Sequence, residues 1–295
     1  MSSKNQKNGQ EKIYEMITNK IIEALEKGTV PWRMPWNGYI KGSPQNFINK
    51  NKYRGINTFL LKLAMRSTPY WITYKQAKQL KGNVKKGEKG YPVIFWKWFE
   101  IDDKETDEKK QVPLLRYYTV FNLDQCEGIK LPDAEKPETR EFNPIDQAEA
   151  IISGMPNKPT IIHNEARAYY RPSADIVNMP ERELFHSDSE YYSTLFHELT
   201  HSTGHETRLN RENGIKNHMF GAADYSKEEL IAEMGAAFLC ADAAIEHETI
   251  ENSAAYIDGW LTRLKNDKKI LIQAAGKAQK ATDYILNKQY NNPDD

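Results

Sequence analysis

The sequence predicts an α+β protein of two domains, and three observations support this prediction. Apolar residues recur at helical spacing near both ends of the chain, apolar residues alternate over 91–101 and 114–123, and a proline-rich charged segment lies near the middle. A length of 295 residues exceeds that of most single domains, and 39% hydrophobic residues suffice for sizeable cores. We therefore place a first domain at 1–130, a linker at 131–144 and a second domain at 145–295.

The first domain is expected to combine helices with a pair of long strands. Ile13, Ile17 and Ile21 share one face of a helix that Gly28 can end. The alternating apolar residues predict two strands joined through a charged hairpin tip. In chain order, the predicted elements are a helix, a proline-rich extended loop, two short helices and the two strands: 13–27, 32–36, 57–65, 73–80, 91–101 and 114–123.

The second domain is expected to be mainly helical, with short strands ahead of its central helix. The central stretch contains neither proline nor glycine, and Asp188 or Ser189 can cap its start. A following helix is expected to begin at Ser226, with Glu229 completing a capping box. In chain order, the predicted elements are a short helix at 146–153, a strand at 160–163, a hairpin of 168–171 with 175–179, and the two helices at 189–203 and 226–245. Two long C-terminal helices complete the chain, the last of them at about 255–287.

The strongest chemical signal is the HExxH motif within FHELTH at 196–201. His197 and His201 are four residues apart, so they lie on the same face of a helix. Their imidazoles can bind one metal ion while Glu198 acts as general base toward a metal-bound water. The motif indicates a zinc-dependent hydrolase, most simply a peptidase, although another divalent transition metal would suit the same donors. The alternative, a core helix with two hydrogen-bonded histidines, is disfavoured because these residues are poorly suited to a dry core.

A catalytic zinc site needs a third protein ligand, for which the sequence offers several candidates. The metzincin pattern fails because Thr207 stands where its third histidine belongs. His205 is a weak candidate, since a ligand two turns along would diverge from the ion. The following long helix is a better source, with Glu229 as the ligand and Glu233, one turn later, as the residue that orients a metal-bound histidine. Reversed roles for these two glutamates remain open.

The two halves of the chain differ in charge, although the net charge of the whole is zero. Residues 1–140 contain 26 Lys and Arg against 16 Asp and Glu, whereas residues 141–295 contain 15 against 25. Within the first 98 residues the counts are 19 against 5. A basic half predicts a polyanionic partner, and an acidic half does not.

Aromatic residues accompany this basic charge. Five of the six tryptophans lie within the first hundred residues, interleaved with lysines and arginines. This combination binds single-stranded nucleic acid, because cations contact phosphates and aromatic rings stack on bases. Individual tryptophans can equally belong to the core, so the prediction concerns the region more than any one residue. The candidate DNA-contacting residues are Trp32, Arg33, Trp36, Lys52, Tyr53, Arg54, Trp71, Lys75, Lys85, Lys86 and Lys89.

Several motifs in both halves of the chain are specific in combination. In the first half they are WRMPW, KYRGINTFLL, WITYKQAKQLKGNVKKGEKG and VFNLDQCEGI, which begin at residues 32, 52, 71 and 120. In the second half they are AYYRPSADIVNMP, FHELTHSTGHETRLNR and EELIAEMGAAFL, which begin at residues 168, 196 and 228. Through these motifs the chain resembles the ArdC-type antirestriction proteins, from about residue 11 to the C-terminal helices.

The resemblance implies an N-terminal domain that binds single-stranded DNA and a C-terminal zincin-like metallopeptidase domain. It implies His197, His201 and Glu229 as metal ligands, with Glu198 as general base. It further implies a protein of plasmids or other mobile elements, which shields incoming single-stranded DNA from host restriction during conjugation. Peptidase turnover and the identity of a substrate do not follow from the resemblance.

Two functions of different classes remain open. In the first, the N-terminal domain brings a metallopeptidase to a DNA-bound protein substrate, and Tyr225 or Tyr169 stabilises the oxyanion. In the second, the chain is a DNA-protecting binder whose metal site is only structural. A role as an accessory module of a primase is disfavoured, because the sequence contains no evident polymerase segment.

The remaining features predict a cytoplasmic protein. Cys126 and Cys240 fall in different predicted domains and are expected to be reduced thiols. No apolar run approaches the roughly 18 residues of a membrane span. The N-terminus is polar and lacks the apolar stretch of a signal peptide, so we expect no membrane partner.

Overall fold

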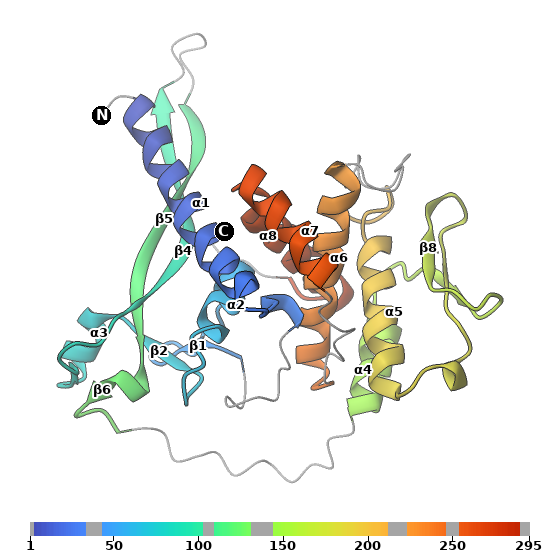
Figure 1. Cartoon of the computed structure of the whole chain (residues 1–295), viewed down its shortest axis with the longest axis horizontal. Coiled ribbons are helices and arrows are strands. Elements are labelled where there is room, and N and C mark those ends of the chain that lie inside the picture. Colours follow the sequence, from blue (N-terminus) through green and yellow to red (C-terminus); the bar gives the residue numbers. More distant parts are fainter. Residues whose placement is uncertain are drawn as a thin grey trace.

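The computed structural model describes residues 3–33, 43–102, 109–130, 144–211, 223–245 and 254–289. Within these ranges helices and small sheets are mixed, which confirms the predicted α+β class. A long β hairpin lies at one side of the molecule, and the helices of the second half lie at the other (Figure 1). Among these residues, no helix combines the length and apolar character that crossing a bilayer would require.

The first half of the chain is organised around one long antiparallel hairpin. Its elements are α1 (Ser3–Glu26), η1 (Pro31–Arg33), β1 (Gln45–Asn46), α2 (Ile56–Lys62), β2 (Tyr70–Ile72), α3 (Tyr74–Gln79), β3 (Asn83–Val84), β4 (Tyr91–Asp102), β5 (Lys109–Asn122), η2 (Leu123–Gln125) and β6 (Cys126–Glu127). β4 and β5 pair from Tyr91 opposite Val120 to Asp102 opposite Lys109. β2 adds to β5, and β1 adds to β2, so the strand order is β1-β2-β5-β4. β3 and β6 form a separate two-stranded ribbon.

The second half surrounds a pair of adjacent helices, α5 and α6. Its elements are α4 (Pro144–Gly154), β7 (Thr160–Ile162), β8 (Tyr169–Arg171), η3 (Pro172–Ala174), β9 (Ile176–Asn178), η4 (Arg182–Leu184), α5 (Asp188–Ser202), α6 (Ala223–Asp242), α7 (Ala254–Asn266) and α8 (Ile270–Ile285). The three strands form a small sheet in the order β7-β9-β8, which leaves β8 at an edge. Figure 1 shows α5 between α6 and this sheet.

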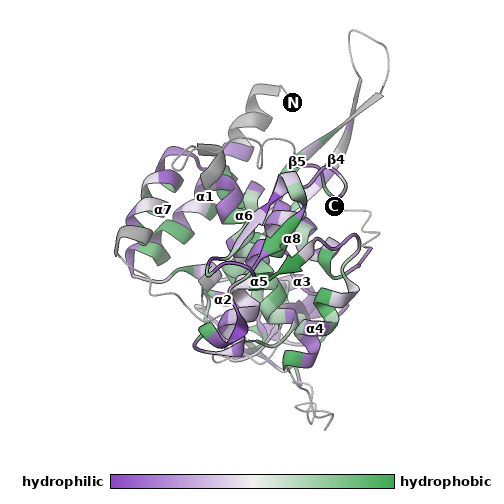
Figure 2. Ribbon diagram, turned by 90° about the vertical axis from the view of Figure 1, so that its right-hand side faces the viewer, coloured by the Kyte–Doolittle hydropathy of each residue, from purple (hydrophilic) through white to green (hydrophobic). Residues whose placement is uncertain are grey.

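The largest hydrophobic core draws on both halves of the chain. It combines α1 and α2 with α6, α7 and α8. Trp32 meets Trp260 edge to face with ring centroids 5.8 Å apart, and Phe59 stacks on Phe238 at 5.0 Å. Figure 2 shows hydrophobic and hydrophilic residues alternating along α7, as expected of a helix with one face in a core. The first half is therefore packed onto α6, α7 and α8.

Helix α6 lies between two hydrophobic cores. Leu230 and Met234 belong to the shared core, whereas Leu239 belongs to a second core formed with α4, α5 and β9. Where α6 meets α5, a Cβ atom on Gly235 would lie 2.5 Å from Thr200 Cγ2. Because such a contact is too close for any side chain, glycine allows α5 and α6 to approach each other here.

Several predicted boundaries are wrong for physical reasons. α6 begins at Ala223, so Ser226 lies inside its first turns and is not its N-cap. The cap of α5 is Ser187, whose hydroxyl accepts a hydrogen bond from the backbone N–H of Glu190. The predicted helix over 255–287 is two helices, α7 and α8, separated where the Asp267 carboxylate accepts from the Lys269 backbone N–H.

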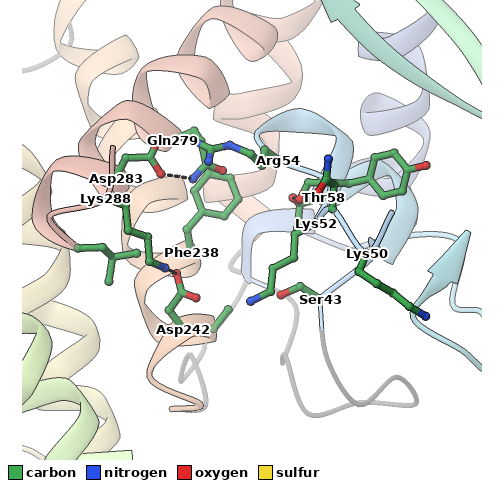
Figure 3. A pocket seen from close by; sticks show the side chains of 14 residues that line it. Ser43, Lys50, Lys52, Arg54, Thr58, Phe238, Asp242, Gln279, Asp283 and Lys288 are labelled. Carbon is green, nitrogen blue, oxygen red and sulfur yellow. Dashed lines mark hydrogen bonds and ion pairs between the residues drawn. The ribbon is translucent and has the colours of Figure 1, made fainter. Parts of the chain in front are cut away.

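The two halves meet at a shared cavity, where one ion pair joins them and a second lies within the second half. This cavity, of about 420 Å³, lies between the segment 43–58 and the helices α6 and α8 (Figure 3). Arg54 pairs with Asp283 on α8, and Lys288 pairs with Asp242 at 3.7 Å. No residue of the HExxH motif lines the cavity. We therefore interpret it as part of the contact between the halves.

Candidate metal site and basic surface

Helix α5 presents both histidines of the motif toward α6. The ring centroids of His197 and His201 are 4.7 Å apart, and their Nε2 atoms are 3.1 Å apart. This follows from the four-residue spacing, which places the two side chains one turn apart on one face. Two imidazole nitrogens at this separation can contact a single ion.

Glu229 on α6 completes the cluster. Its carboxylate oxygens lie 3.6 Å from His197 Nε2 and 3.5 Å from His201 Nε2. The three ligand atoms all lie within 4.8 Å of one another. Two imidazole nitrogens and a carboxylate oxygen are donors that fit zinc and related divalent metals. The structure thus brings together the three residues that the sequence analysis selected.

The charges around His197 favour its protonated form when no metal is bound. Burial lowers the pKa of His197, but the neighbouring carboxylates, with Glu229 first among them, outweigh burial and raise it to about 9. Glu198 and Glu233 add to this effect. Glu198 itself is 8% exposed, on the same helix as the histidines. A bound cation would replace the proton in this negative environment.

Glu228 is a functional candidate that the sequence analysis missed. Its Oε1 atom lies 3.7 Å from His201 Nδ1, on the opposite side of the imidazole from Glu229. Arg211 pairs with the same carboxylate at 2.6 Å, and both side chains are only 7% exposed. Burial alone would raise the pKa of Glu228, but His201 and Arg211 outweigh it and lower the pKa to about 2. The signal in the sequence is the pair of adjacent glutamates at 228 and 229, of which the sequence analysis selected only Glu229.

The other candidates of the second half occupy varied positions. The sequence analysis assigned Glu233 to orient a histidine, and its charge raises the pKa of His197. His205 is held by Thr207, whose hydroxyl is 2.9 Å from its Nδ1 atom, and it is not part of the metal cluster. The Tyr169 hydroxyl donates to Glu165 at 2.9 Å. Tyr225 lies in α6, but its side chain is outside the described residues.

Two aromatic candidates for DNA stacking require correction. Trp32 is 1% exposed and Trp71 is fully buried, so neither ring can stack on a base in this conformation. Both residues are core residues, as the alternative in the sequence analysis anticipated. The Arg54 guanidinium contacts a protein carboxylate, because it pairs with Asp283 between the two halves. Trp36 and the side chain of Arg33 lie outside the described residues.

The lysine candidates, in contrast, lie at the surface. Lys52, Lys75, Lys85, Lys86 and Lys89 are all exposed, whereas the ring of Tyr53 is partly buried. Lys85 donates to the backbone carbonyl of Asp124 at 2.8 Å, which fixes one end of the loop that follows β3. Tyr74, at the start of α3 and 53% exposed, is an aromatic side chain that the sequence analysis did not select, and the Lys78 ammonium lies 5.6 Å from the centroid of its ring.

Comparison with known protein families assigns each half of the chain separately. Residues 11–121 match the N-terminal domain of anti-restriction factor ArdC, and residues 146–277 match the zincin-like metallopeptidases. The crystal structure of metal-free antirestriction ArdC from the R388 plasmid has a TM-score of 0.72 and 39% identity, with 94% of this chain and 99% of that chain covered. The chain belongs to the ArdC antirestriction family. The Mn(II)-bound structure of the same ArdC protein is similar, with a TM-score of 0.71.

Relatives of this ArdC-family chain include proteins of different length. The uncharacterized protein y4eC of Sinorhizobium fredii is 37% identical, with 94% of this chain and 92% of that protein covered. A DNA primase TraC of Escherichia coli is 37% identical over 92% of this chain, and a second TraC is 36% identical. The chain spans only 20% and 27% of the length of these two primases.

Proposed function

We propose that this ArdC-family chain binds incoming single-stranded DNA of a mobile element and protects it from host restriction with the help of a zinc-dependent peptidase site. The observation that carries the peptidase part is the convergence of His197, His201 and Glu229, with Glu198 on the same helix. Family membership supports the antirestriction role. We place the protein in the cytoplasm, where single strands arrive during transfer.

The residues of the cluster have distinct roles in this proposal. His197, His201 and Glu229 would hold zinc, which polarises a scissile carbonyl and acidifies a bound water. The Glu198 carboxylate would hold a proton of the attacking water and pass it to the leaving amine. The edge strand β8 offers unpaired backbone groups to an extended peptide. Tyr169 on that strand remains the candidate that stabilises the oxyanion.

The DNA-binding part of the proposal is supported by the charge of the first half and by its exposed lysines. Lys75, Lys85, Lys86 and Lys89 are exposed at the surface, where lysines can contact phosphates, and Tyr74 can supply a ring for a base. The shared core packs the first half of the chain against α6, the helix that carries Glu229. A protein bound to the same single strand is therefore the substrate class that we propose for the peptidase site.

The substitution Glu198→Gln tests whether the peptidase reaction underlies protection. The variant should keep its fold and its metal, yet hydrolyse a general protein substrate such as casein, with single-stranded DNA present, about 100 to 10,000 times more slowly. Protection is measured as the efficiency of conjugative transfer into a restricting host. Glu206→Gln, an exposed change near the same helix, is the control. If protection survives Glu198→Gln, the chain protects as a DNA binder with a structural metal site.

A further inference from the structure

Two buried arginines fix the loop that follows the metal-binding helix α5. Arg208, with a side chain 1% exposed, binds both carboxylate oxygens of Asp175 at 2.9 and 2.7 Å. Arg211 binds both carboxylate oxygens of Glu228 at 2.6 and 3.3 Å. The first pair ties the loop to the small sheet, and the second ties it to α6. The two pairs are alike in chemistry, but the Asp175 side chain is 35% exposed whereas that of Glu228 is 7% exposed, and only the second pair adjoins the metal cluster.

The Glu228 carboxylate stands directly behind one of the candidate ligands. Glu228 Oε1 is 3.7 Å from His201 Nδ1, while His201 Nε2 faces His197 Nε2 and the Glu229 carboxylate. An imidazole that binds a cation through Nε2 carries its proton on Nδ1 and needs an acceptor for it. Glu228 is the carboxylate that the structure provides on that side of the ring.

Arg211 gives this acceptor a fixed orientation. A buried carboxylate without a partner is costly and would turn toward any available donor. Arg211 occupies both of its oxygens, and is itself held by Thr203 Oγ1 and by the backbone carbonyl of Thr200 at 2.9 Å. Both of these residues lie at the C-terminal end of α5. The guanidinium therefore links the end of one ligand-bearing helix to the start of the other.

We propose that Glu228 is the positioning residue of His201, and that Arg211 holds Glu228 in the orientation that the ring requires. The pair thus sets the affinity of the site for its metal without contacting the metal. The sequence analysis assigned an orienting role to Glu233, whose charge raises the pKa of His197, and Glu228 is a second carboxylate that lies behind the other histidine. This inference rests on the proposed metal site and goes beyond it, because it assigns a function to two residues outside the ligand set.

A matched pair of double variants tests the proposal in the full-length chain. Arg211→Met with Glu228→Leu removes the acceptor behind His201. Because both partners are replaced, no buried charge is left unpaired, and apolar replacement of a buried ion pair is often tolerated. Arg208→Met with Asp175→Asn removes the equivalent pair on the sheet side, and asparagine accepts the left-handed backbone of residue 175 (φ 50°). The affinity for Zn²⁺ is measured by calorimetry, and the visible absorption of bound Co²⁺ reports the geometry of the ligands.

We expect the Arg211 and Glu228 variant to bind Zn²⁺ about 10 to 100 times more weakly, with an altered Co²⁺ spectrum. The control should bind within about twofold of the wild type, even if its melting temperature falls. Glu228→Gln, which retains one acceptor oxygen, should fall between the two and serves if the double variant does not fold. Equal Zn²⁺ affinity in wild type and variants would overturn this inference alone. No Zn²⁺ binding by the wild type would overturn the proposed metal site, and the inference with it.

Discussion

The metal cluster and the lysine surface of the first half are built in opposite ways. The cluster is small and partly buried, and its geometry depends on the contact between two helices. The lysine surface is spread over exposed side chains that follow short elements and turns. A closely coupled site should fail when one member is lost, whereas a dispersed surface should weaken by increments. The substitutions below test this difference, in order of decreasing effect.

The largest effect is expected from removing a ligand of the cluster. Glu229→Ala should weaken Zn²⁺ binding by more than the roughly 100-fold that changes behind metal ligands cost, because two histidines alone leave the ion poorly held. Calorimetric titration of the metal-free chain measures the change. Glu233→Ala, one turn along α6, is the comparison that decides between the two glutamates. If it causes the larger loss, the ligand and the neighbouring carboxylate must exchange roles.

The lysine surface should respond by degrees. Reversing the charge of Lys85, Lys86 and Lys89 together should weaken binding of single-stranded DNA by roughly 10- to 100-fold, equally for all sequences. The slope of log affinity against log salt should fall by about 2, since each lost phosphate contact contributes about 0.7. Single reversals should each give a fraction of this change. If the triple variant lost affinity for one DNA sequence only, base recognition would be the better explanation. Lys158→Glu, in the second half of the chain, is the control.

The close contact of α5 with α6 connects folding to the cluster. Gly235→Ala should destabilise the chain by about 1–3 kcal/mol, because the added Cβ would meet Thr200 Cγ2 at 2.5 Å. The same change at Gly276, on the exposed side of α8 with nothing within 4 Å of its Cβ, should instead stabilise by up to about 1 kcal/mol. Chemical denaturation measures both values. Thr200→Ala, combined with Gly235→Ala, should recover part of the loss if the contact is its cause.

The sequence predicted the metal cluster better than the DNA surface, and the reason lies in the kind of pattern. A spacing of four residues on one helix fixes where His197 and His201 lie, because the helix itself sets the geometry. Glu228 could not be assigned in this way, since its contact with His201 depends on how α5 and α6 cross and on Arg211, seventeen residues earlier. That crossing is a property of the packed core.

Composition is a weaker guide because it carries no direction. The tryptophans of the basic half predicted base stacking, yet Trp32 and Trp71 are in the core, where large aromatic side chains contribute most to stability. The long strands β4 and β5 were predicted from alternation, but the strands of two or three residues, such as β1 and β3, are too short to show a period. Charge located the basic region, and only the fold shows which side chains remain exposed.

The mildest test of the contrast uses pH. In the metal-free chain the pKa of His197 is raised from 6.5 to about 9, so a metal must displace a proton at neutral pH. Zn²⁺ affinity should therefore increase up to tenfold per pH unit between about 6.5 and 9, with release of a proton that calorimetry in buffers of different ionisation enthalpy detects.

The folding stability of the metal-free chain should change with pH in the opposite direction. Because the folded pKa exceeds the unfolded value, this histidine stabilises the metal-free chain below pH 6.5, and the stabilisation is lost as pH rises through 9. We expect no comparable pH dependence of DNA binding, because no metal has to displace a proton at the lysine surface. A parallel pH dependence of metal and DNA binding would mean that the shared core couples the two sites, and that the closely packed cluster and the dispersed surface do not act independently.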